Sequence, residues 1–187
     1  MDPGPHPSAV VRSIPNVLSA LRLALAAAFA WVAPPFRPYA VAGAGVSDWL
    51  DGFIARRFHA ASWIGGVLDA VADKALVVSV LATFVREGTL APWQAGVLLL
   101  RDASVLAAAS YFVLKREWSA FTNMPSRPLG RVTTAVLFLL FLAITALPDL
   151  RWLHATLLFL AIVASGLAAF DYGQAFLRAR SSLSAKP

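Results

Sequence analysis

Four aspartates lie close together in an apolar part of the chain: Asp48, Asp51, Asp69 and Asp73. Carboxylates cost free energy in apolar surroundings and are rarely left there without a partner. Four of them near one another also repel unless positive charge gathers between them. A hard divalent cation, which prefers oxygen ligands, supplies such charge. The chain has no cysteine, so the pattern predicts a metal site built from oxygen or histidine ligands.

The spacing of these aspartates is helical. Asp48 and Asp51 share a helix face with Ala55, and Asp69 and Asp73 are one turn apart. Each helix therefore presents two carboxylates to a shared gap, which could hold two Mg²⁺ or Mn²⁺ ions. Two-metal sites of this kind clamp phosphoryl oxygens during transfer reactions. Small residues leave room beside the carboxylates, and Arg56 could hold a phosphate bidentately.

The elements that position these residues are membrane helices. The 187 residues are 59% hydrophobic and only 14% charged, with a mean hydropathy of +0.69. Soluble domains are nearer half apolar and a quarter charged. Six apolar segments approach the roughly 20 residues that cross a bilayer as a helix. They cover residues 14–33, 39–54, 64–85, 93–114, 132–147 and 152–170, with the last helix continuing to about residue 177. We expect an all-α, polytopic integral membrane protein with six transmembrane helices.

The basic residues predict the orientation of this bundle. If both termini are cytoplasmic, ten of the 16 lysines and arginines lie on the cytoplasmic side, three lie outside and three lie within spans. That bias follows the positive-inside rule. Both aspartate pairs then lie within roughly 12 Å of the cytoplasmic ends of their helices and face each other. The net charge of +6 is explained by topology and anionic lipid, and no basic stripe indicates a nucleic-acid partner.

We predict three segments: a polar N-terminal arm (1–13), a six-helix membrane domain (14–177) and a basic C-terminal tail (178–187).

The string D-x2-D-G-x2-A-R-x8-G-x3-D-x3-D resembles the signature of the CDP-alcohol phosphotransferases at every position. Its fixed residues are Asp48, Asp51, Gly52, Ala55, Arg56, Gly65, Asp69 and Asp73. Residues 14–22, with Asn16, Ser19 and Arg22, resemble the first helix of that family. The length and the six-span plan fit as well, so the resemblance covers nearly the whole chain after Ser13.

The resemblance implies a reaction in which an acceptor hydroxyl attacks the β-phosphate of a CDP-linked lipid and CMP leaves. The four aspartates would ligate Mg²⁺ or Mn²⁺, and Asp73 would also be the general base. The CDP group would lie against Gly52, Ala55, Arg56 and Gly65, with Asn16 and Ser19 as further contacts. Asn16 and Ser19 could equally cap a helix or bond between helices.

The acceptor is indicated by weaker motifs. Arg101-Asp102 and residues 107–112 resemble the fourth helix of CMP-forming cardiolipin synthases. Residues 125–135 resemble a segment of both that branch and the phosphatidylglycerophosphate synthases, with Arg131 replacing a lysine. Asp171-Tyr172-Gly173 also resembles the cardiolipin branch. These motifs favour phosphatidylglycerol as acceptor over glycerol 3-phosphate.

Arg101, Arg131 and Arg22 are the candidate acceptor-binding residues. Arg22, Lys74 and Arg101 could instead be charge partners of nearby aspartates.

Three other interpretations of the aspartates remain. They could be solvated carboxylates at helix ends, part of a divalent-cation transporter, or the remnant of an inactive family member. A transporter does not require Gly52, Ala55, Arg56 and Gly65 at these spacings. The resemblance further implies a homodimer. The high alanine and arginine content indicates a bacterial inner membrane, and the charge bias predicts an active site on its cytoplasmic side. The expected partners are CDP-diacylglycerol, the acceptor and membrane lipids.

Overall fold

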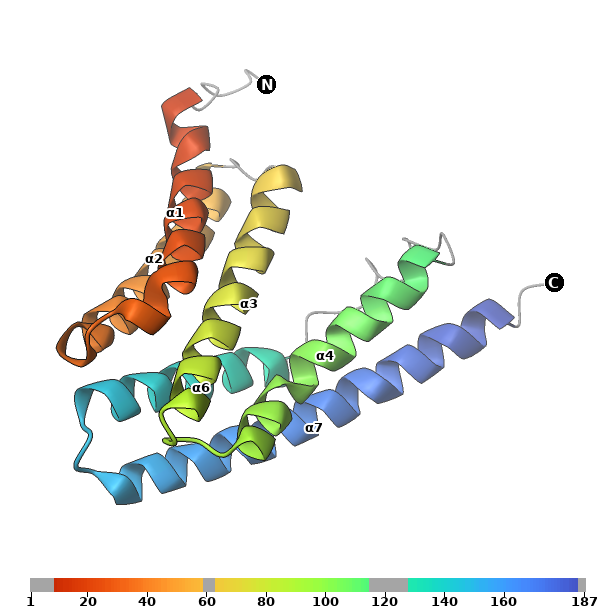
Figure 1. The fold of residues 1–187 in the computed structure, drawn as a ribbon. Helices are drawn as coiled ribbons and strands as arrows, with labels where there is room; N and C mark the ends of the chain where they lie inside the picture. The colour runs from red at the N-terminus through yellow and green to blue at the C-terminus, as the bar shows by residue number, and fades with distance from the viewer. Residues whose placement is uncertain (1–8, 59–62, 115–127, 185–187) are drawn as a thin grey trace. The chain divides into compact units, whose positions relative to one another are not determined.

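The computed structural model of the chain describes residues 9–58, 63–114 and 128–184. Within these ranges it contains six α-helices and two short 3-10 turns, and no strand (Figure 1). The α-helices are α1 (Ala9–Ala28), α2 (Arg37–Phe58), α3 (Trp63–Arg86), α4 (Pro92–Leu114), α6 (Pro128–Ala146) and α7 (Arg151–Ser184). The prediction of an all-α protein is confirmed, and each predicted apolar segment corresponds to one helix.

Helix boundaries follow local chemistry. After α1 the chain forms a 3-10 turn at Phe29–Trp31, and then Val32 and Ala33 are extended. Ala33 precedes Pro34, and the ring of a proline disfavours helical backbone in the residue before it. The 3-10 turn Pro34–Phe36 leads into α2. Gly88, which turns the chain after α3, has a φ of 75°, a conformation that glycine adopts at little cost.

Two boundaries differ from the expectation. Helix α1 begins at Ala9, within the predicted N-terminal arm (1–13) and five residues before the predicted first segment (14–33). Helix α7 continues to Ser184, so most of the predicted C-terminal tail is helical. Ser, Leu and Arg are acceptable helix formers, and nothing in residues 178–184 interrupts the helix.

The chain divides into two compact units, Met1–Thr89 and Leu90–Pro187. In the first unit, α1 packs against both α3 and α2 (Figure 1). In the second, α7 packs against both α4 and α6. The core of the first unit includes Phe29, Leu76 and Phe84, and that of the second includes Leu140 and Phe141.

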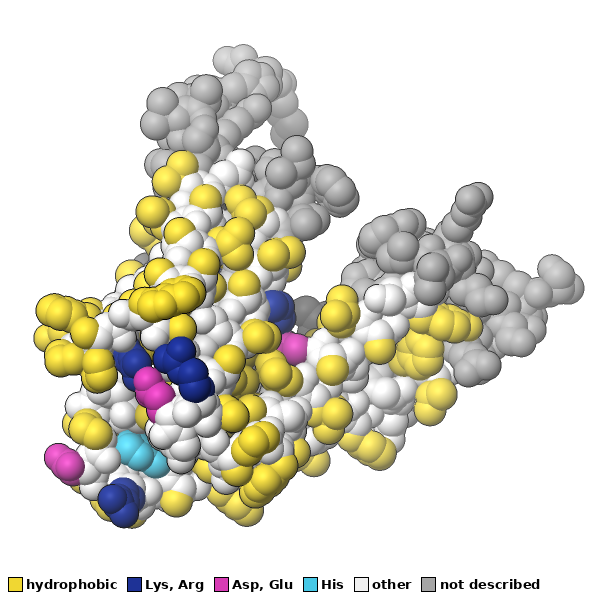
Figure 2. Space-filling view, in the orientation of Figure 1, with side chains coloured by type: hydrophobic (Ala, Val, Ile, Leu, Met, Phe, Trp, Pro, Cys, Tyr) yellow, Lys and Arg dark blue, Asp and Glu magenta, His cyan; other side chains and the backbone are white. Residues whose placement is uncertain are grey.

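Large apolar side chains are also exposed along the helices. Figure 2 shows hydrophobic side chains spread over the visible faces of both units, with few charged ones among them. Examples are Leu21, Val78, Leu106, Phe159 and Phe170. Among the residues that the structure describes, two helical segments are long and apolar enough to cross a membrane, Leu129–Ala146 and Arg151–Leu177, and Asn16–Trp31 is a shorter apolar helix. The six-span topology with cytoplasmic termini stays a prediction.

Candidate active site

The predicted aspartates lie on two neighbours of α1. Asp48 and Asp51 are on α2, and Asp69 and Asp73 are on α3. Five further signature residues lie in α2 and α3 as expected, but the structure describes only their backbone: Asp51, Gly52, Ala55, Arg56 and Gly65.

Arg22 connects the two aspartate helices. Its Nη1 donates to Oδ1 of Asp69 at 2.8 Å and to Oδ1 of Asp48 at 3.2 Å. Its Nε lies 3.4 Å from Oγ of Ser47, and the arginine side chain is fully buried. Since both carboxylate oxygens lie within hydrogen-bond reach of one nitrogen atom, Asp48 and Asp69 are close together. The predicted proximity of the two pairs is therefore confirmed for these two residues.

Ser19 joins the same group from α1. It is buried, and its hydroxyl lies 3.4 Å from Oδ1 of Asp69, a long hydrogen bond between helices. This contact matches the interhelical role that the sequence left open beside nucleotide binding. Asn16 is half-buried one turn earlier on α1.

Asp73 lies one turn beyond Asp69 on α3. Its Oδ2 is 3.2 Å from Nζ of Lys74, and its side chain is 19% exposed. Lys74 thus takes the role of charge partner that the sequence allowed for it.

The donor set suits a hard cation, because every described candidate ligand is a carboxylate oxygen. Asp48 and Asp69 are 46% and 43% exposed, so both can be reached from outside the helices. Among the described side chains, no group of three or more His, Cys, Asp or Glu could hold a metal ion. The predicted group also requires Asp51, whose side chain is not among them.

A second polar cluster lies in the other unit, around Arg101 of α4. Its Nη1 donates to Oγ1 of Thr134 on α6 at 2.9 Å and lies 3.7 Å from Oδ1 of Asp102. A Cβ placed on Gly130 would lie 2.8 Å from Nη2 of Arg101 and 3.3 Å from the hydroxyl of Tyr172 on α7. The absence of a side chain at Gly130 therefore makes room for the guanidinium.

The three candidate acceptor residues have different surroundings within their own units. Arg101 lies in the second cluster, Arg131 is exposed on α6, and Arg22 contacts the aspartates. Four residues of these clusters were not predicted from the sequence as site residues: Ser47, Gly130, Thr134 and Tyr172. Gly130, Thr134 and Tyr172 lie in the motifs given above, which could have indicated them. Nothing in the sequence indicated Ser47 except its position before Asp48.

A family model described as CDP-alcohol phosphatidyltransferase matches residues 12–167. The chain belongs to the CDP-alcohol phosphatidyltransferase family. The match contains the complete aspartate signature, Arg22 and the Arg101 cluster as far as Thr134.

Relatives within this family carry two kinds of name. A cardiolipin synthase (CMP-forming) of Streptomyces coelicolor is 38% identical over 117 residues, which cover 57% of this chain and 54% of the relative. A CDP-diacylglycerol--glycerol-3-phosphate 3-phosphatidyltransferase of Escherichia coli is 29% identical over 182 residues, covering 91% and 97%. The chloroplastic CDP-diacylglycerol--glycerol-3-phosphate 3-phosphatidyltransferase 1 of rice is 34% identical over 127 residues, covering 60% of this chain. The chain spans only 37% of that rice protein.

Proposed function

We propose that this protein transfers a phosphatidyl group from CDP-diacylglycerol to an acceptor hydroxyl and releases CMP. The observation that carries the proposal is the complete aspartate signature, with Asp48 and Asp69 held together by one buried arginine. Family membership supports the same chemistry. A cation transporter is disfavoured because it would not need the glycines, alanine and arginine of the signature.

In the proposed reaction, the acceptor oxygen forms a bond to the lipid-linked phosphorus of CDP-diacylglycerol. The phosphoanhydride bond to CMP breaks, and CMP leaves with that electron pair. The carboxylate of Asp73 accepts the proton of the acceptor hydroxyl, which requires hydrogen-bond reach between them. The partial exposure of Asp73 is consistent with this role.

Asp48, Asp51, Asp69 and Asp73 would hold two Mg²⁺ or Mn²⁺ ions. When bound, such ions neutralise charge on phosphoryl oxygens and stabilise the leaving group. The chain itself supplies the oxygen ligands, and Arg56 and the small residues of α2 and α3 would receive the CDP group.

We further propose that the Arg101 cluster binds the phosphate of the acceptor. Arg101 is 16% exposed, and its buried Nε has no hydrogen-bond partner in the part of the chain that the structure describes. A buried N–H without an acceptor is costly, and a phosphate oxygen would satisfy it. The unpaired Nε therefore supports an anionic acceptor. The Arg101-Asp102 and Asp171-Tyr172-Gly173 motifs favour phosphatidylglycerol, because they resemble the cardiolipin synthase branch.

Glycerol 3-phosphate is the second candidate acceptor. The relative from Escherichia coli, whose name specifies that acceptor, matches over 97% of its own length. The product would then be phosphatidylglycerol phosphate rather than cardiolipin.

For the cellular setting we propose six transmembrane helices, cytoplasmic termini and an active site at the cytoplasmic side of a bacterial inner membrane. The lysine and arginine bias and the apolar exposed helix surfaces support this placement. A homodimer is part of the proposal through the family resemblance alone.

The test is CMP release by purified protein in detergent with CDP-diacylglycerol, Mg²⁺ and one acceptor at a time. Release only with phosphatidylglycerol would establish a cardiolipin synthase, and release only with glycerol 3-phosphate would establish the alternative. Release with neither acceptor would contradict both assignments and direct the search to other alcohols.

A further inference from the structure

Arg22 is an arginine without access to solvent in the middle of an apolar helix. It is one of the largest fully buried side chains of the described residues, and its partners come from α2 and α3. A buried arginine costs free energy unless its charge is matched by carboxylates and its N–H groups are bonded. Asp48, Asp69 and Ser47 provide this match.

The arginine contacts each aspartate on one oxygen. Both ion pairs use Oδ1, at 3.2 Å for Asp48 and 2.8 Å for Asp69, while the two carboxylates are close to half exposed. The guanidinium therefore lies on the buried side of the pair. The outward part of each carboxylate stays accessible to a further cation.

We propose that Arg22 is a positioning residue of the metal site, holding Asp48 and Asp69 in the arrangement that ligates the ion. This inference rests on the metal site of the proposed function. Two carboxylates on different helices repel each other in an apolar environment, and the guanidinium offsets that repulsion before any ion binds. It also fixes one oxygen of each carboxylate, as hydrogen-bonding partners behind metal ligands generally do.

Two other roles for Arg22 lead to different measurements. Binding of an acceptor phosphate would need a guanidinium that the lipid can reach, whereas this one is 0% exposed. A guanidinium that merely replaces the ion would compete with it, so its removal would tighten metal binding. If Arg22 positions the ligands, its substitution has the opposite effect and weakens metal binding.

The experiment measures Mn²⁺ binding to the full chain in detergent, without substrate, from the loss of the electron paramagnetic resonance signal of free Mn²⁺. We expect Arg22→Met to raise the Kd for Mn²⁺ about 10- to 100-fold, the usual effect of removing a residue that orients metal ligands. Arg22→Lys should have a smaller effect, since an ammonium keeps the charge but loses the planar fork. Arg86→Met, which removes an arginine that is 60% exposed in the same unit, is the matched control.

Arg22→Lys and Ser47→Ala keep the test decisive if Arg22→Met does not fold. Ser47→Ala removes the contact to Nε and should raise the Kd a few-fold at most. An unchanged or lower Kd for Mn²⁺ in folded Arg22→Lys protein would overturn the inference. A raised KM for the acceptor with unchanged Mn²⁺ binding would assign Arg22 to the acceptor instead.

The same measurement separates this inference from the proposed function. If the unsubstituted protein releases CMP but binds no Mn²⁺, the metal site and the role of Arg22 both fail. If Mn²⁺ binds, is lost in Asp69→Asn and is weakened in Arg22→Lys while no CMP forms with any acceptor, the transferase proposal fails and the role of Arg22 stands.

Discussion

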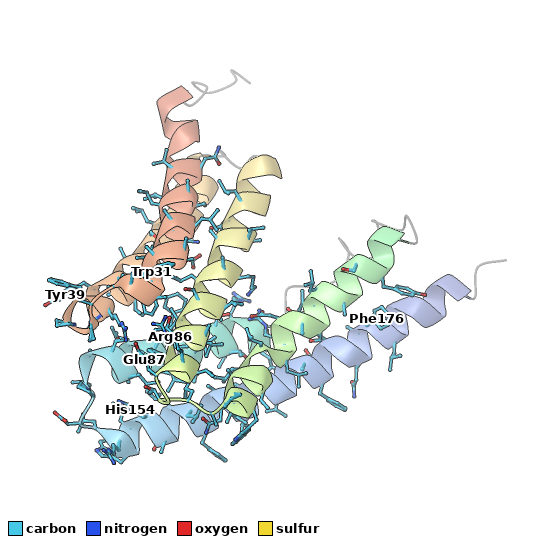
Figure 3. All side chains as sticks on the ribbon, viewed as in Figure 1. Trp31, Tyr39, Arg86, Glu87, His154 and Phe176 are labelled. Atoms are coloured by element: carbon cyan, nitrogen blue, oxygen red, sulfur yellow. The ribbon has the colours of Figure 1, made fainter. Side chains whose placement is uncertain are left out.

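Arg37 and Glu87 form a two-pronged ion pair that joins the start of α2 to the turn after α3. Nη1 of Arg37 donates to Oε2 of Glu87 at 2.6 Å, and Nη2 donates to Oε1 at 2.7 Å. Nε of the same arginine donates to the carbonyl of Val32 at 3.0 Å. Figure 3 shows Glu87 beside Arg86 at the end of α3. Arg37 and Glu87 both lie outside the predicted spans 39–54 and 64–85. This contact fixes the ends of two helices that carry the aspartates.

The pair predicts a pH-dependent stability. The hydrogen bonds from Arg37 are the main reason that the pKa of Glu87 lies below its ordinary value of 4.5. A lowered carboxyl pKa means that the stabilisation is present above pH 4.5 and is lost as the pH falls below it. Arg37 is buried but Glu87 is 34% exposed, so we expect Glu87→Gln to cost about 1 kcal/mol at pH 7, the upper end for solvent-accessible pairs, and much less in acid. Thermal unfolding in detergent at pH 7 and below pH 4 measures this.

The control for that experiment is Asp149→Asn, which removes an exposed carboxylate from the turn between α6 and α7. It should leave the unfolding temperature nearly unchanged at both pH values. A Glu87→Gln deficit of equal size at both pH values would contradict the assignment of the effect to the ion pair.

Asp73→Asn should abolish turnover while substrate still binds. An amide cannot accept the proton of the acceptor hydroxyl, and loss of general base catalysis typically costs about 100- to 10,000-fold. CMP release and binding of CDP-diacylglycerol are the two measurements. Glu87→Gln is the control, since Glu87 has no proposed catalytic or binding role, and it should keep near-normal turnover. Retained turnover in Asp73→Asn would remove Asp73 as the base.

Removal of divalent ions should stop the reaction reversibly. Without the ions, no positive charge offsets the repulsion among the carboxylates, and nothing holds the phosphoryl oxygens or neutralises their charge. We expect EDTA-treated protein to release no CMP, and added Mg²⁺ or Mn²⁺ to restore release. Full activity in EDTA would show that the aspartates do not act through a metal.

Gly130→Ala should weaken acceptor binding without removing Arg101. The new Cβ would lie 2.8 Å from Nη2 of Arg101, and the flexible end of the arginine would move away at little cost in stability. Losing about one charge-assisted hydrogen bond to the acceptor phosphate, roughly 1.5 kcal/mol, corresponds to about a tenfold higher KM. The measurement is the dependence of CMP release on acceptor concentration.

Gly166→Ala on α7 is the matched control, because a Cβ there meets no atom within 4 Å. It should leave the KM unchanged and can stabilise the helix by up to about 1 kcal/mol. Equal KM values for the Gly130 and Gly166 variants would argue against acceptor binding at Arg101.

Much of this protein is determined locally by its sequence. Apolar runs separated by prolines and charged turns predicted the six helices, because a chain in apolar surroundings must satisfy its backbone groups within each helix. Helical spacing placed two aspartates on each of two neighbouring helices, and the contacts of Asp48 and Asp69 with one arginine agree with that arrangement. The start of α1 was placed at residue 14, where the apolar run begins, whereas the helix extends back to Ala9.

The partners of the arginines were decided by tertiary structure alone. From the sequence, Arg22 could have faced a lipid phosphate or an aspartate, since both are anionic acceptors for the hydrogen bonds of a guanidinium. Packing of α1 against α2 and α3 buries the side chain of Arg22, so a lipid phosphate cannot reach it. Likewise, Arg101, Thr134 and Tyr172 come from three different helices and meet around Gly130. Such meetings depend on how helix faces fit together in three dimensions, and no local spacing in the chain encodes that fit.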